Sequence, residues 1–254
     1  MIKKMRFVFF RASIFVLGIS THVEAQKGVG LDESLQEFFT GETVYAQERK
    51  EVQFTLKPAY WKKEGLKMLH IPLQVEYGFS DRFQVELQLP YYNLHPKIGQ
   101  TINGMGNVEV GFLYNYLKGN GPFALSLALD IGLPTANKQK EIDEAEIEWE
   151  PTLIVAKKIG IAQVHASVGA EITKTESAFY YNLATVVPIG DWRATLELSG
   201  KINEQLIYLT PGVLWKGIDD FEFGIGFSKG NSAWGVILMA THEFSLPTRM
   251  KQQR

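Results

Sequence analysis

The stretch WRATLELSGK, from Trp192 to Lys201, decides the fold. Apolar and polar residues alternate along it, with Trp192, Ala194, Leu196 and Leu198 on one side and Arg193, Thr195, Glu197, Ser199 and Lys201 on the other. Successive side chains of a β-strand point to opposite faces of the sheet. A period of two therefore predicts a strand with one apolar and one polar face.

The same alternation recurs on both sides of this stretch. We expect strands at residues 51–61, 70–77, 82–92, 107–117, 122–133, 147–157, 161–173, 178–188, 191–202, 205–215, 220–228 and 234–244. Most are near the roughly 9 to 11 residues with which a tilted strand crosses a bilayer. No helical pattern separates them, so the chain is predicted to be all-β: a closed antiparallel transmembrane β-barrel of about 12 strands in an up-and-down meander.

The connections between the expected strands differ at the two ends of the barrel. Those after even-numbered strands are short and contain glycine, as at residues 78–81 and 189–190. Glycine supplies the positive φ that tight hairpin turns require. Those after odd-numbered strands are longer on average, above all residues 93–106 and 135–146. Outer-membrane barrels have this layout, with the short turns in the periplasm.

Aromatic residues gather near both ends of the expected strands. Because amphipathic rings prefer the headgroup level of a membrane, two aromatic girdles are expected of a membrane barrel. The predicted girdle residues are Trp61, Tyr91, Trp149, Tyr181, Trp192, Trp215, Trp234 and Phe244. A soluble lipocalin-like barrel, with its apolar face inward, would show the same alternation. The number of strands, the continuous apolar face and the girdles favour the membrane barrel.

Residues 1–25 have the pattern of a secretory signal peptide. A basic start is followed by a short apolar stretch, and small residues precede the expected cleavage site after Ala25. We therefore expect residence in the cell outer membrane, with outer-membrane lipid and the barrel assembly machinery as partners. The formal net charge is −2 and becomes more negative when the basic signal is removed. This charge argues against a nucleic-acid partner.

Six short sequence stretches are distributed along most of the predicted mature chain. They are YGFSDRF at 77–83, LPY at 89–91, MGNVEVG at 105–111, GLPT at 132–135, EQLIYLTPG at 204–212 and FGIG at 223–226. In these stretches the chain resembles the outer-membrane β-barrel family described as transporters of the meta-pathway of phenol degradation. The resemblance implies a closed barrel that moves small molecules, among them aromatic or apolar compounds.

The polar faces of the expected strands carry the candidate functional residues. We predict that the lumen is lined by Glu76, Arg82, Glu86, Glu109, Asp130, Glu150, His165, Glu171, Arg193, Glu197, Lys201 and Glu222. Acidic side chains around a pore set a preference for cations, which suits a passive channel for a small-molecule solute. Alternatively, these residues form ion pairs with one another, because isolated buried charge is costly, and the paired side chains fill the lumen. A filled lumen suits a structural or adhesion barrel.

His165 and Ser167 lie two residues apart on one expected strand, and Asn182 lies on the next. A serine nucleophile needs an adjacent base and an orienting third group, so a lipid hydrolase using Ser167 and His165 is a further alternative. Ala166 and Val168 belong to the apolar set, however, which turns both polar side chains into the lumen and away from lipid. We therefore predict no catalytic residue, no metal site and no cofactor.

Residues 26–50 are predicted to form a periplasmic N-terminal segment. Between Leu31 and Phe39 the apolar residues recur at helical spacing, with Asp32 as a possible N-cap. The segment is expected to be either a short periplasmic helix or an inserted plug that narrows the lumen. Residues 51–244 then form the barrel, and residues 245–254 form a periplasmic tail.

Overall fold

The computed structural model describes residues 31, 33–118, 123–137, 146–202 and 206–247. The expected signal peptide, residues 26–30 and the tail beyond residue 247 lie outside the described residues. Strands account for the regular structure, and no helix long and apolar enough to cross a membrane occurs in the described ranges.

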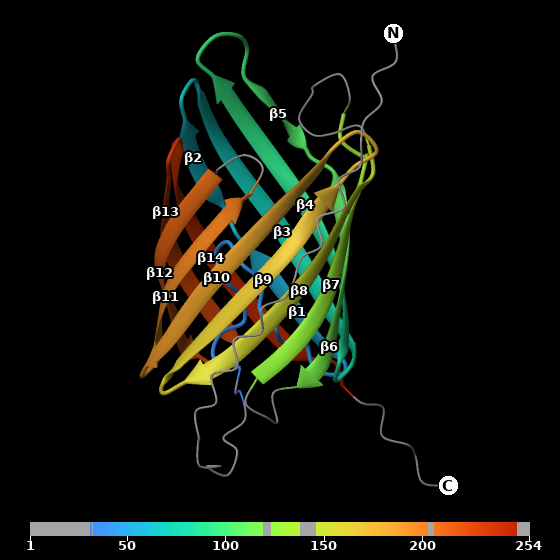
Figure 1. Ribbon diagram of the computed structural model, residues 1–254, viewed down its shortest axis with the longest axis vertical. Helices are drawn as coiled ribbons and strands as arrows, with labels where there is room; N and C mark the ends of the chain where they lie inside the picture. Colours follow the sequence, from blue (N-terminus) through green and yellow to red (C-terminus); the bar gives the residue numbers. More distant parts are fainter. Residues whose placement is uncertain (1–30, 32, 119–122, 138–145, 203–205, 248–254) are drawn as a thin grey trace, which may run out of the picture.

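The strands close into one antiparallel barrel (Figure 1). They are β1 (Glu51–Leu56), β2 (Ala59–Lys63), β3 (Leu66–Ser80), β4 (Phe83–Pro96), β5 (Ile102–Met105), β6 (Val108–Lys118), β7 (Phe123–Leu133), β8 (Glu148–Ile159), β9 (Ala162–Ile172), β10 (Ser177–Ile189), β11 (Trp192–Lys201), β12 (Leu206–Ile218), β13 (Phe221–Gly230) and β14 (Ala233–Ser245). Neighbours follow chain order, and β14 closes the barrel on β1 and β2.

These strands occupy twelve positions around the barrel, which confirms the predicted architecture. β1 and β2 share one position, because both pair with β3 and with β14. The break between them falls at Lys57 and Pro58, and proline has no N–H to donate to a ladder. β5 and β6 also share one position, since both pair with β4.

The two ends of the barrel differ as the sequence predicts. Short turns at residues 81–82, 160–161 and 190–191 lie at what we call the turn end. Gly160 and Gly190 have φ values of 62° and 59°, the left-handed region that glycine enters at no steric cost. The β2–β3 hairpin and the loop between β4 and β5 lie at the opposite end, which we call the loop end (Figure 1).

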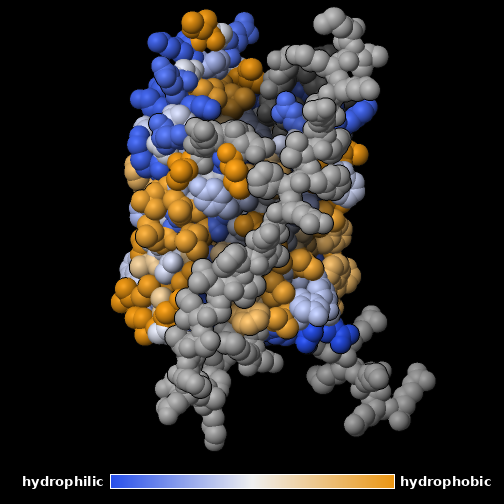
Figure 2. Space-filling view, viewed as in Figure 1, coloured by the Kyte–Doolittle hydropathy of each residue, from blue (hydrophilic) through white to orange (hydrophobic). Residues whose placement is uncertain are grey.

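The apolar set of each strand faces outward. Leu127 and Leu196 have exposed fractions of 51% and 49%, whereas Glu197 and Glu222 are fully buried. On the face that Figure 2 shows, hydrophobic residues form a broad belt, with hydrophilic residues above it at the loop end. A soluble barrel would have the opposite arrangement, so the outer face is built for contact with an apolar solvent.

Candidate functional site in the barrel lumen

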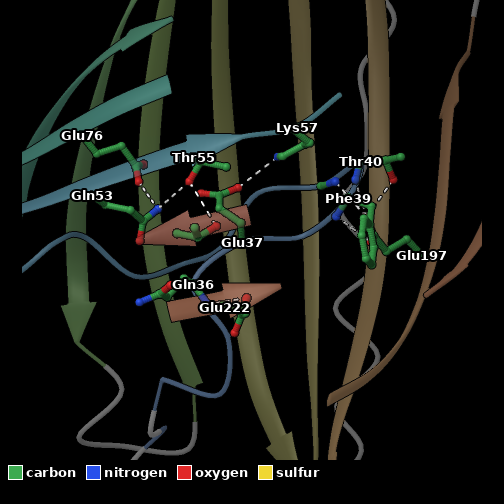
Figure 3. A network of polar contacts seen from close by, with 12 residues as sticks. Gln36, Glu37, Phe39, Thr40, Gln53, Thr55, Lys57, Glu76, Glu197 and Glu222 are labelled. Atoms are coloured by element: carbon green, nitrogen blue, oxygen red, sulfur yellow. Dashed lines mark hydrogen bonds and ion pairs between the residues drawn. The ribbon is translucent and has the colours of Figure 1, made fainter. Parts of the chain in front are cut away.

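Residues 33–50, which we call the lumen segment, lie inside the barrel and form neither helix nor strand. Their main attachment is the carboxylate of Glu197 in β11. It accepts hydrogen bonds from the backbone N–H groups of Phe39 (2.9 Å), Thr40 (2.8 Å) and Gly41 (2.9 Å), and from the Thr40 hydroxyl (2.7 Å). Figure 3 shows this group in the lumen. Hydrogen bonds to a charged acceptor are among the stronger ones in proteins, so this carboxylate fixes the middle of the segment.

The ring of Phe39 packs against three glycines of the barrel wall, Gly212, Gly224 and Gly226, which we call the glycine seat. Gly212 of β12 and Gly224 and Gly226 of β13 all point inward, and a Cβ atom at any of them would meet the Phe39 ring. Leu214, Ile237 and Met239 complete the apolar contact around it. Three neighbouring inward glycines therefore leave a space that one aromatic side chain fills.

The start of the lumen segment is tied to the turn end. Arg193 Nε donates to the carbonyl of Ser34 at 2.7 Å, and the Gln36 side chain donates to Glu243 at 2.5 Å. The backbone N–H of Gln36 lies 3.4 Å from Glu222 Oε1. Residues 34–36 thus provide hydrogen-bond partners for inward-facing charged side chains.

The second half of the segment returns toward the turn end. Asn115 Nδ2 and Ser126 Oγ both donate to the carbonyl of Val44, at 2.7 and 2.5 Å. The Gln47 N–H donates to Gln84 Oε1 at 2.8 Å. The backbone of Glu48 then passes so close to Gly78 that no side chain would fit there. The segment is a loop that enters and leaves at the turn end, and its tip at Thr40 and Gly41 binds Glu197 in the middle of β11.

Beside the lumen segment lies a cavity of about 200 Å³ with a strongly acidic lining. Its carboxylates come from the segment and from five strands: Glu37, Glu42, Glu76, Glu86, Glu109, Asp130 and Glu150. The cation in its lining is Lys57, which already pairs with Glu37 at 3.2 Å. The cavity therefore offers cations many carboxyl oxygen acceptors.

A second cavity of about 250 Å³ lies on the other side of the segment tip. It is lined by Tyr180, Tyr208 and the ion pair between Lys201 and Glu171, whose Nζ–Oε2 distance is 2.5 Å. Gly41 and Glu42 line both cavities. The tip of the lumen segment is thus a wall shared by the two spaces.

Glu42 sits in this shared wall. Burial in the lumen, helped by the nearby carboxyl groups of Asp130 and Glu37 and opposed by Lys57, raises the pKa of its carboxyl from 4.5 to about 8. Removal from water disfavours the charged form of an acid. Glu42 accordingly holds a proton at neutral pH while the segment is docked.

Most of the predicted lumen residues are brought together by the structure. Glu76, Glu86, Glu109, Asp130 and Glu150 line the first cavity, and Glu171 and Lys201 line the second. Arg193, Glu197 and Glu222 hold the lumen segment instead. Arg82 needs a correction, because it lies in the exposed β3–β4 turn, beyond the start of β4 at Phe83.

His165 and Ser167 do not form a catalytic pair. The His165 ring lies edge-on to Phe38 and Tyr45, with centroid distances of 5.0 and 5.7 Å. Within the described part of the chain, neither ring nitrogen has a hydrogen-bond partner. Ser167 therefore has no positioned base, which a serine nucleophile requires. Within the same residues, no group of three metal-ligating side chains could hold an ion.

Several predicted girdle residues lie on the outer face. Trp149 and Trp192 have exposed fractions of 45% and 51%, and Trp192 lies 6.4 Å from Trp215. Phe244 stacks on Phe54 at 6.0 Å and Trp234 lies 5.9 Å from Tyr60, while Tyr91 and Tyr181 are half-buried.

Trp61 is an error of the sequence analysis. It shares the inward face of β2 with Ala59, packs beside Gly235, and contacts the apolar cluster around Phe39. Its nearness to the strand end suggested a girdle, but its place in the alternation sends the ring into the lumen.

Sequence reasoning missed the glycine seat and the attachment of the segment to Glu197. The inward glycines were a usable signal, since glycine in a strand marks close approach of another group.

Solved structures with the same fold are outer-membrane barrels. An outer membrane channel from Pseudomonas putida F1 matches with a TM-score of 0.65 at 10% identity, over 79% of this chain and 98% of that chain. The KdgM porin matches at 0.57 and 12% identity, over 75% and 99%. The NanC porin matches at 0.54 and 10% identity, over 76% and 100%. The chain has the fold of outer-membrane barrels.

No protein-family model and no curated protein sequence matches the chain. The resemblance to transporters of phenol degradation therefore stays a prediction.

Proposed function

We propose that this chain is an outer-membrane channel for small polar solutes, with a preference for cations. The observation that carries the proposal is the acidic cavity inside a barrel whose outer face is apolar. Negative linings raise the local concentration of cations and repel anions. The lining favours polar and cationic molecules over the apolar compounds that the family resemblance implies, because apolar molecules gain little from carboxylate oxygens.

The lumen segment closes this channel. Residues 33–50 lie inside the barrel and are held there at Arg193, Glu197, Asn115 and Ser126. A solute that enters from the loop end meets the wall formed by Gly41 and Glu42. Passage thus requires the segment to move, and the apparent conductance reports how often it does.

A structural barrel with a filled lumen is the second candidate. The number and quality of the attachments favour it, since each hydrogen bond to the segment also stiffens the wall. The two candidates differ in what happens when the attachments are weakened. A channel opens, whereas a structural barrel only becomes less stable.

Planar-bilayer recordings of the purified mature chain test the proposal. We expect rare openings of the intact chain, frequent openings of an E197Q variant, and a reversal potential in a KCl gradient that shows K⁺ passing in preference to Cl⁻. If both proteins seal the bilayer to ions while remaining folded, the structural role replaces the channel. A preference for Cl⁻ would remove the cation claim and keep the channel.

A further inference from the structure

Basic side chains form a row on the barrel at the loop end. Strand register places Lys229 of β13, Trp234 of β14, Lys62 of β2, Lys67 of β3 and His95 of β4 side by side across five neighbouring strands. The three lysines and His95 are all exposed. Four basic residues and one tryptophan on consecutive strands make a continuous band rather than scattered surface charge.

The row lies on the outer face, at the border of the hydrophobic belt. The next outward row toward the turn end consists of Phe227, Val236, Tyr60 and Leu69. Phe227 and Tyr60 are 47% and 37% exposed, and both rings lie near that of Trp234, at 6.3 and 5.9 Å. The basic row therefore begins where the apolar surface ends.

No acidic side chain of the described residues forms an ion pair with the lysines of the row, Lys62, Lys67 and Lys229. A groove of about 320 Å³ adjoins the row and adds Lys97 to it. The acid nearest in sequence is Glu64, exposed in the β2–β3 turn. Figure 2 shows this end of the barrel as a hydrophilic cap above the belt.

We infer that this row binds the phosphate groups of an anionic lipid in the surrounding leaflet. The ammonium group of lysine is a common phosphate binder, and tryptophan at the border of a belt sits at headgroup level. The side chains point sideways from the barrel and not into the lumen, so a membrane lipid reaches them and a passing solute does not. The inference rests on the proposed membrane placement but not on the channel activity.

The test uses the purified mature chain in nanodiscs of phosphatidylcholine, with and without lipid A as the phosphorylated glycolipid. Native mass spectrometry counts the lipid A molecules retained. The variant K62Q/K67Q removes the centre of the row. Its matched control is K118Q/K157Q, which removes two exposed lysines at the turn end. At about 1 kcal/mol for each lysine near an anionic surface, K62Q/K67Q is expected to weaken retention about thirtyfold.

Retention by the control variant and by K62R/K67R, which keeps the charge, should match the unchanged protein. Equal losses in both glutamine variants, or no loss in either, would overturn the inference. Inorganic phosphate at millimolar concentration should not displace lipid A; full displacement would indicate a free-anion site and also overturn it. Bilayer recordings of K62Q/K67Q separate the two proposals, because the channel should still open when lipid retention is lost.

Discussion

The ring of Phe39 lies directly against Gly212 of β12, so that the space of a side chain at position 212 is taken by a residue 173 positions earlier in the chain. This contact makes the inner wall and the lumen segment complementary. Any side chain at Gly212 would compete with Phe39 for the same volume, and interiors of proteins tolerate such overpacking poorly.

Gly212→Ala should therefore open the channel. A methyl group in the seat costs about 1 to 3 kcal/mol in a well-packed site, which raises the open population roughly tenfold or more. Single-channel open probability measures the effect. The control is Gly132→Ala on β7, where the new Cβ would lie 3.3 Å from Glu148 Cβ and away from the segment. Equal open probabilities in the two variants would mean that Phe39 does not hold the segment.

Glu197→Gln should release the segment without disturbing the barrel. Glutamine keeps one acceptor oxygen and presents an NH₂ group to the remaining donors. A buried donor left without an acceptor costs about 1 to 3 kcal/mol. We expect a protease to cleave within residues 33–50 faster than in the unchanged protein, as measured by gel electrophoresis. The unfolding temperature of the barrel should not change. A segment that resists protease as well as the unchanged protein would show that Glu197 is dispensable for docking.

Closure should weaken as the pH rises. Docking raises the pKa of Glu42 from 4.5 to about 8 through burial, so the docked state binds a proton that the released state gives up. Docking is then fully favoured below pH 4.5 and loses this contribution as the pH rises toward 8. Conductance at pH 8.5 should exceed conductance at pH 5, and Glu42→Gln should flatten the dependence. A profile unchanged by this substitution would assign the titration to another group.

The fold was predictable because alternation is a local property. Leu196 and Glu197 lie on opposite faces of their strand whichever strands pair with it. The period of two therefore predicts which side chains face outward without any knowledge of strand pairing. The break at Pro58 and the placing of Trp61 were not predicted. Alternation alone makes residues 51–61 one continuous strand, and the position of Trp61 near the strand end alone suggests a girdle.

The path of the lumen segment could not be predicted from the sequence for a different reason. Its apolar spacing fits a helix, but the N–H groups of Phe39, Thr40 and Gly41 bind a carboxylate more than 150 residues away. A partner so distant leaves no trace in local periodicity. The sequence therefore suggested a helix or a plug without deciding between them.

If the acidic lining sets the preference for cations, replacing part of it should weaken that preference. The double variant E109Q/E150Q removes two carboxylates from the first cavity and should lower the K⁺ to Cl⁻ permeability ratio in bilayer recordings. D219N/D220N replaces two acidic groups in the exposed β12–β13 turn and serves as its control. Should the control lower the ratio as much, selectivity arises at the turn end and not in the cavity.

The outward face predicts how the barrel responds to charge. Leu127 lies within β7 on the apolar belt, so Leu127→Arg should destabilise the barrel in lipid by about 2 to 4 kcal/mol, the cost of arginine near the bilayer midplane. Ile159→Arg, at the turn-end tip of β8, should cost less than about 1 kcal/mol, because the side chain reaches water there. Reversible urea unfolding in phosphatidylcholine vesicles gives both values. If the two substitutions cost the same, the belt does not face lipid tails, and a soluble barrel accounts for the chain better.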